Sequence, residues 1–216
     1  MSIGNNEWVS SLTHFLGALF SVAGLVLLVI FSAMYGSVGK TIGFSIFGAG
    51  LILLYLSSAV YHIISRKHRA KAIFKKIDHA MIYVLIVSTY TPLMLAIPER
   101  GLGWAMFGIV WGLALVGILH KIFQKTEGNI ISSALFIFMG WISVFMIPTL
   151  LNSIPAIGIW WLAIGGIFYT AGAVFFALEK KFPREGHFGM HEIFHLFVMA
   201  GSFSHFWFMF RYVLYI

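Results

Sequence analysis

Long apolar segments constrain the fold of this chain more than any other feature. Only 10% of its 216 residues are charged and 60% are hydrophobic, whereas soluble domains average about 25% charged residues. A membrane-crossing helix needs roughly 20 apolar residues, and seven such segments are separated by short polar breaks: about 13–35, 41–64, 77–97, 102–122, 130–151, 156–178 and 188–213. The sequence therefore predicts an all-α, polytopic membrane protein, a seven-transmembrane-helix bundle forming a single domain over residues 1–216.

Basic residues predict the orientation of this bundle. Eleven Lys and Arg residues lie in the loops after the second, fourth and sixth segments, and three (Lys40, Arg100 and Arg211) lie on the other side. Because basic loops stay in the cytoplasm, we expect a cytoplasmic N-terminus and a C-terminus outside. The first ten residues contain Glu7 and no basic segment, so we expect no cleaved signal peptide. The net charge of +7 lies in these short loops, which favours anionic lipids over nucleic acid as the partner.

Five polar residues converge on one layer of the predicted bundle. Ser58 and His62 lie near the end of the second segment, Asp78 near the start of the third, and His191 and His195 near the start of the last. The topology brings all five to the cytoplasmic side, and ionisable residues within a membrane usually have a function. Because there are no cysteines, only His, carboxylate or water can bind a metal.

The spacing of these residues predicts a zinc site. Histidines four apart share a helix face, and catalytic zinc takes three protein ligands and a water. We expect His62, His191 and His195 as ligands and Asp78 as the group that holds or deprotonates the water. Ser58 is expected to orient a ligand or water, or only to bond a backbone carbonyl one turn back. Two alternatives stay open: Asp78 is a direct metal ligand, or it is a helix N-terminal residue favoured by the dipole.

The string HEIFH also matches the H-E-x-x-H signature of zinc proteases, in which Glu192 would be the general base. That interpretation is disfavoured because no Asp or Glu follows Glu192, and Gly201 stands where the longer signature has its third His. His205 lies ten residues beyond His195, roughly 15 Å along a helix, too far to share an ion. The third ligand must come from another helix, and Glu192 is a bystander or orients a ligand.

Other histidines and the glycines give weaker signals. His14 is expected in the same layer as the site, and His205 is expected to bond a neighbouring helix. Glycines either allow helices to approach closely or are ordinary membrane-helix residues. We favour the ordinary interpretation for Gly43, Gly48, Gly50, Gly165 and Gly166.

Four strings in order carry a family resemblance: EWVSSLTHFLG near the start, SSAVYH, KIDHAMIY and HEIFH. Together they resemble the haemolysin III family, the bacterial branch of the progestin and adipoQ receptor superfamily. The resemblance implies zinc near the cytoplasmic face of a bacterial inner (plasma) membrane, bound by His62, His191 and His195. It also implies that Asp78 holds a zinc-bound water and that Ser58 is the motif serine.

Two functions follow from this resemblance. Relatives in the wider superfamily include alkaline ceramidases, so the first is a zinc-dependent hydrolase that cleaves membrane lipid amides or esters. Bacterial members are linked to cell lysis and to membrane homeostasis, so the second is a non-enzymatic sensor or cytolytic protein with structural zinc. The sequence names no protein partner.

Overall fold

The computed structural model describes residues 7–65, 67–124, 130–179, 181–182 and 188–216, and these form helices and connecting turns. Six helices are long and apolar enough to cross a membrane: α1 (Trp8–Tyr35), α2 (Val38–Ile63), α3 (Lys71–Ala96), α4 (Arg100–Phe123), α7 (Ala156–Leu178) and α8 (Met190–Arg211, followed by the 3-10 turn η2, Val213–Tyr215). The expected all-helical, polytopic membrane bundle is confirmed at this level. Large apolar side chains such as Phe20, Phe123 and Phe145 are exposed on its outer surface, as lipid contact requires.

The fifth apolar segment is shorter and divided. It consists of α5 (Ile130–Trp141), the 3-10 helix η1 (Ile142–Met146) and α6 (Ile147–Leu150). Pro148 explains the break, because a proline lacks the N–H of an α-helical turn and its ring clashes with the carbonyl four residues earlier. Tyr90 of α3 stabilises the break: its hydroxyl donates toward the Met139 and Gly140 carbonyls and accepts from the Ser143 N–H, at 2.8–2.9 Å.

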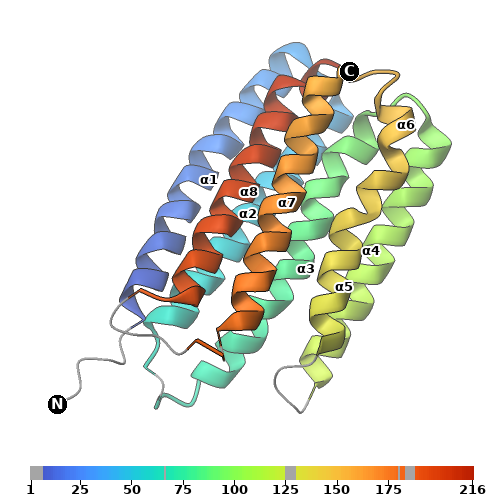
Figure 1. The fold of residues 1–216 in the computed structure, drawn as a ribbon. Coiled ribbons are helices and arrows are strands. Elements are labelled where there is room, and N and C mark those ends of the chain that lie inside the picture. The colour runs from blue at the N-terminus through green and yellow to red at the C-terminus, as the bar shows by residue number, and fades with distance from the viewer. Residues whose placement is uncertain (1–6, 66, 125–129, 180, 183–187) are drawn as a thin grey trace.

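The long helices and the divided fifth segment alternate in direction along the chain, and α8 lies beside both α1 and α7 (Figure 1). The starts of α1, α3 and α8 and the ends of α2 and α7 therefore meet at one end of the bundle, the lower end in Figure 1. The C-terminus lies at the opposite end. This arrangement brings the SSAVYH, KIDHAMIY and HEIFH segments into one layer.

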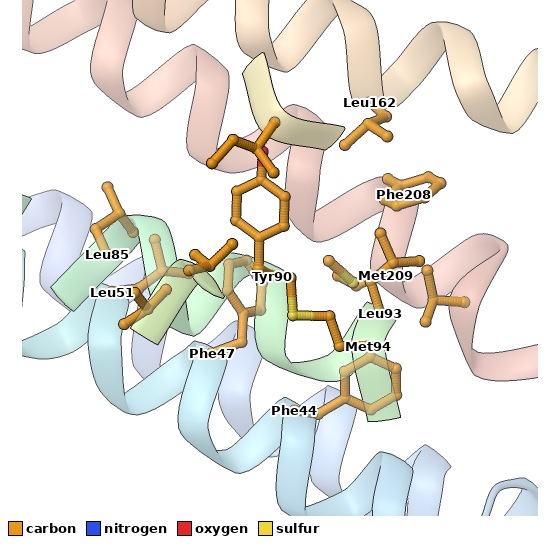
Figure 2. Close-up of a cluster of buried hydrophobic side chains, with 14 of the residues drawn as sticks. Phe44, Phe47, Leu51, Leu85, Tyr90, Leu93, Met94, Leu162, Phe208 and Met209 are labelled. Atoms are coloured by element: carbon orange, nitrogen blue, oxygen red, sulfur yellow. The ribbon is translucent and has the colours of Figure 1, made fainter. Parts of the chain in front are cut away.

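A large part of the core lies between α2, α3, α7 and α8. Figure 2 shows large buried side chains that interlock there: Phe44, Phe47 and Leu51 of α2, Tyr90, Leu93 and Met94 of α3, Leu162 of α7, and Phe208 and Met209 of α8. This packing fixes the relative positions of the helices that carry the five polar residues.

Glycines allow this close packing. A Cβ on Gly43 would lie 2.5 Å from the Pro92 Cα of α3, and one on Gly48 would lie 2.6 Å from Leu25 of α1. Gly50 and Gly165 meet Ser88 and His205 equally closely. The ordinary interpretation of these four glycines is wrong, because each stands where a neighbouring helix leaves no room for a side chain. It holds for Gly166, whose Cβ would touch only Trp141, at 3.9 Å.

Candidate metal centre

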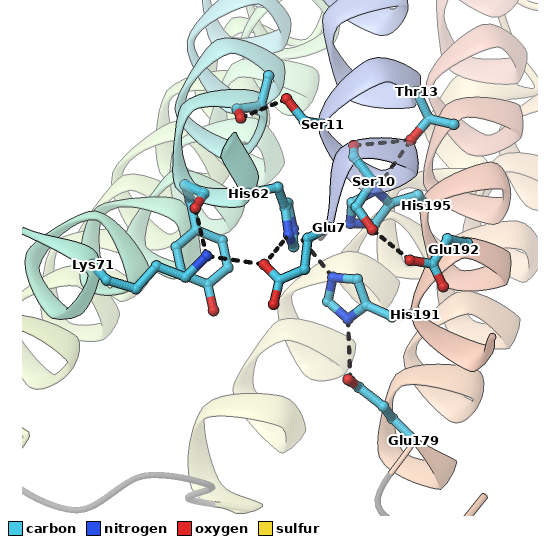
Figure 3. A network of polar contacts seen from close by, with 12 residues as sticks. Glu7, Ser10, Ser11, Thr13, His62, Lys71, Glu179, His191, Glu192 and His195 are labelled. Atoms are coloured by element: carbon cyan, nitrogen blue, oxygen red, sulfur yellow. Dashed lines mark hydrogen bonds and ion pairs between the residues drawn. The ribbon is translucent and has the colours of Figure 1, made fainter. Parts of the chain in front are cut away.

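Three histidines from two helices meet at the lower end of the bundle (Figure 3). His62 comes from the last turn of α2, and His191 and His195 come from the first turns of α8. One ring nitrogen from each lies within 4.8 Å of the others. The Nε2 atoms of His62 and His191 are 3.2 Å apart, and His62 and His195 are almost fully buried. The three residues expected as ligands are therefore brought together.

The outward nitrogens of these rings have polar partners. Nδ1 of His62 lies 3.0 Å from Glu7 Oε2, and Nδ1 of His191 lies 3.1 Å from Glu179 Oε2. Nδ1 of His195 lies 3.4 Å from the Thr13 hydroxyl. Metal-binding histidines usually donate their second N–H to such a carboxylate or oxygen, which fixes the tautomer and the ring orientation.

These partners provide a test of whether a cation fits. A carboxylate can only accept, so the Nδ1 atoms of His62 and His191 carry the protons and their Nε2 atoms carry lone pairs. The two lone pairs then face each other at 3.2 Å, which is repulsive unless a proton or a metal ion lies between them. Two nitrogens bound to tetrahedral zinc at 2.0–2.1 Å lie about 3.3 Å apart. The donor set and its spacing therefore fit a metal ion.

Glu7 also connects this cluster to α3. The oxygen that accepts from His62 lies 2.9 Å from Lys71 Nζ, and the Glu7 side chain is only 13% exposed. Figure 3 shows this carboxylate between the imidazole and the ammonium group. Because a charge-assisted hydrogen bond is short and strong, Lys71 holds the Glu7 carboxylate in the orientation that His62 requires.

The first turn of α1 is fixed to both of its neighbours, and this positions Glu7. The Ser11 hydroxyl donates to the Ala59 carbonyl of α2 at 2.9 Å, and the Ser10 hydroxyl donates to Glu192 of α8 at 2.7 Å. Glu192 is fully buried and also accepts from the Gly189 N–H at 2.8 Å. Its bond to Gly189 caps α8, as a carboxylate in the first turn of a helix commonly does. Its bond to Ser10 joins α8 to α1, and these two bonds account for its burial without a catalytic function.

Asp78 and Ser58 lie beside the cluster. The Ser58 hydroxyl, buried one turn before His62, lies within hydrogen-bonding reach of the Asp78 carboxyl. Among the described residues, the candidate ligand atoms that lie within 4.8 Å of one another belong to the three histidines and do not include an oxygen of Asp78. Because α3 begins at Lys71, Asp78 lies about two turns inside the helix. The helix N-terminal interpretation of Asp78 is therefore wrong, since dipole effects end within the first turn.

His14 also lies in this layer, as expected. Its ring stacks on the ring of His195 at a centroid distance of 3.5 Å and meets Tyr55 edge-on at 5.1 Å. Among the described residues, neither ring nitrogen of His14 has a hydrogen-bond partner, and both are buried. The stack restricts rotation of the His195 ring.

Sequence reasoning missed Glu7, Glu179 and Thr13 as partners of the cluster. Glu7 precedes α1 and Glu179 follows α7, so helical spacing does not relate either of them to a histidine. The hydrogen bond from His191 holds the pKa of the Glu179 carboxyl below its ordinary value, although partial burial opposes this shift. Glu179 is therefore ionised at neutral pH and is a good acceptor for His191.

Comparisons with known proteins agree with the family resemblance that the four sequence strings carry. The family described as Haemolysin-III related matches residues 3–206. The Hemolysin-3 homolog of Bacillus subtilis is 39% identical over 91% of this chain and 89% of its own length. Hemolysin-3 of Bacillus cereus is 36% identical over 96% of this chain and 92% of its own length. The human Monocyte to macrophage differentiation factor is 28% identical over 71% of this chain and 63% of its own length.

Proposed function

This chain belongs to the haemolysin III family, and we propose that it is a zinc-dependent hydrolase of membrane lipid amides or esters. His62, His191 and His195 bind the metal. The observation that carries the proposal is the pair of Nε2 atoms 3.2 Å apart, with a carboxylate behind each ring. Imidazole ligands alone are compatible with several first-row metals. Zinc is favoured because three histidines with a carboxylate beside the open position match its catalytic coordination.

The chain supplies the other groups that such a reaction requires. A zinc ion in this site would acidify a bound water and polarise a carbonyl. Asp78 would accept the proton of such a water, and the Ser58 hydroxyl, which bonds the Asp78 carboxyl, would orient it. The lipid enters from the side, with its acyl chains along the exposed apolar faces of the helices and its carbonyl at the depth of the histidines.

The proposed site lies at the cytoplasmic side of a bacterial plasma membrane. The basic residues gather at the end of the bundle that carries the histidines, which favours a cytoplasmic location of this end. The N-terminus is then cytoplasmic, and the C-terminus lies outside. In this arrangement α5, η1 and α6 together form the fifth of seven membrane crossings.

A second candidate function is non-enzymatic. The Bacillus relatives carry the name hemolysin-3, which favours a cytolytic protein in which the metal only ties α2 to α8. It predicts that loss of the metal lowers the stability of the fold and leaves no lipid turnover to lose. Asp78 distinguishes the two functions. A structural zinc site is closed by a fourth protein ligand, which Asp78 would supply, whereas the hydrolase keeps that position for water and needs Asp78 for turnover but not for zinc binding.

The first experiment compares purified wild-type protein with His191→Ala/His195→Ala and Asp78→Asn. The wild type is expected to contain about one zinc per chain and to release fatty acid from lipid amides or esters. The double variant is expected to lose both the zinc and the turnover, and Asp78→Asn is expected to lose turnover and keep zinc. His120→Ala, which changes a histidine in the last turn of α4 outside the histidine cluster, is the control.

Two results would contradict the proposal. A well-folded wild-type protein that contains no metal rules out a metal-dependent reaction. Zinc-loaded protein that hydrolyses no ceramide, acyl amide or phospholipid leaves the second candidate function.

A further inference from the structure

A basic pocket opens beside the metal centre. It has a volume of about 460 Å³, and its lining includes Arg69, Lys71 and Lys75 together with Glu7 and Glu179. The two carboxylates are those that hold His62 and His191. The pocket and the metal centre therefore share two walls, and a ligand in the pocket lies next to the metal-binding rings.

The charges of this pocket favour an anion. Both carboxylates are engaged, Glu7 with His62 and Lys71 and Glu179 with His191. Lys71 and Lys75 are four residues apart on α3 and so share one face of that helix, and Arg69 lies just before its first turn. The lining carries three cationic side chains and two carboxylates, so one positive charge is in excess, and Lys71 is the cation that pairs with Glu7.

The backbone adds to this positive potential. The pocket lies at the N-terminus of α3, where Ala72 also lines it. Helix N-termini carry a partial positive charge and normally attract Asp or Glu. The N-cap residue, Ala70, has no side chain that can cap the helix, and its own N–H donates to His68 Nδ1. In the described part of the chain, the first turn has no acidic residue, while Lys71 lies in that turn. Cations at a helix N-terminus are unfavourable until an anion binds there.

Membrane topology alone explains why these residues are positively charged, but it does not explain why they converge on one pocket. The positive-inside rule requires basic residues in this loop and is satisfied equally by Lys67 and Lys76, which are exposed and do not line the pocket. Three cations that converge on one pocket beside a metal centre need a further reason. We propose that this pocket binds the phosphate of a phospholipid headgroup and thereby places the acyl carbonyl of the same lipid at the metal centre.

This inference rests on the proposed hydrolase function. It assigns an anionic phospholipid ester, rather than a neutral lipid amide, as the substrate. Arg69 binds two phosphate oxygens with its planar guanidinium group, and Lys75 contributes a point charge. Lys71 keeps its contact with Glu7, so phosphate binding also steadies the carboxylate behind His62 (Figure 3).

The test is a titration of the full chain in a neutral detergent with dihexanoyl phosphatidic acid. Zinc-loaded Asp78→Asn protein, which is expected to keep zinc without turnover, is the background for all variants, and dihexanoyl glycerol, which lacks the phosphate, is the matched neutral lipid. Arg69→Gln/Lys75→Gln is expected to weaken phosphatidic acid binding at least about tenfold, because it removes two charge-assisted contacts. Lys67→Gln/Lys76→Gln removes the same charge from the same end and is expected to change binding less than about twofold.

Three results overturn the inference. The first is that both double variants lose the same affinity for phosphatidic acid, and the second is that dihexanoyl glycerol binds as tightly as phosphatidic acid. The third is that inorganic phosphate binds as tightly as phosphatidic acid, which assigns the pocket to a free anion. Failure of the proposed function is recognised separately. Selective phosphatidic acid binding without turnover in the zinc-loaded wild-type protein rejects the hydrolase and keeps the pocket. Turnover without selective binding rejects the pocket and keeps the hydrolase.

Discussion

The start and the middle of α8 place the same residue type in different surroundings. At the start, His191 and His195 are held from behind by Glu179 and Thr13, and their remaining nitrogens converge with one from His62. In the middle, His205 packs against Gly165 of α7, and its Nε2 lies 3.2 Å from the Leu162 carbonyl. The middle of α8 therefore uses a histidine to join two helices, as expected from the sequence, whereas the start orients its histidines toward a common point.

The comparison teaches where to look for function on a buried helix. A structural histidine reaches the backbone of one neighbour, and a close-packed glycine makes room for it. The histidines of the metal centre instead contact side chains from several elements, and each outer contact fixes which nitrogen remains available. The outer partners therefore distinguish the two regions better than the burial of the histidines does.

The largest expected effect in this comparison comes from Glu7→Gln. The change keeps the shape of the side chain but removes the charge that orients His62 and pairs with Lys71. We expect zinc affinity to fall about 10–100-fold, as for other outer-shell carboxylates, measured by competition with a chromophoric chelator. Glu99→Gln, an exposed acid at the start of α4, is the control, and an equal fall in both variants would mean that Glu7 does not support the site.

Gly165→Ala tests the middle of α8. A Cβ at this position would collide with the ring of His205, and overpacking of a tight contact costs at least about 1 kcal/mol. We expect a lower melting temperature in detergent with unchanged zinc content. Gly166→Ala is the matched control, because its Cβ meets nothing closer than 3.9 Å. Zinc loss in Gly165→Ala would show that the two regions of α8 are not independent.

The sequence predicts one part of this metal centre well and another part poorly, for a physical reason. His62, His191 and His195 could be placed in one layer because helical periodicity and alternating topology determine the depth of each residue. Glu7 and Glu179 could not, because their contacts depend on how the chain enters α1 and leaves α7. The sequence alone shows the depth of a residue in its helix, but not which residues before or after a helix fold back over that depth.

The fold shows the same division. The apolar segments predict the helices, since length and hydropathy are local properties. The 3-10 turn in the fifth segment depends on Pro148 and on the Tyr90 hydroxyl that satisfies its backbone. The close approach of α2 to α3 at Gly43 depends on which helix faces that glycine. Pro148 is visible within its own segment, whereas the Tyr90 hydroxyl and the helix that faces Gly43 come from packing between helices and have no signature in a single segment.

The smallest expected effect comes from Glu179→Gln, which removes the charge behind His191. The Glu179 side chain is 44% exposed, compared with 13% for Glu7, so water screens its charge and can replace it as the acceptor. We expect zinc affinity to fall less than about tenfold, the low end for an outer-shell partner. Glu7→Gln, measured under the same conditions, is the reference variant. A loss from Glu179→Gln larger than that from Glu7→Gln would reverse this order and show that His191, rather than His62, depends most on its outer carboxylate.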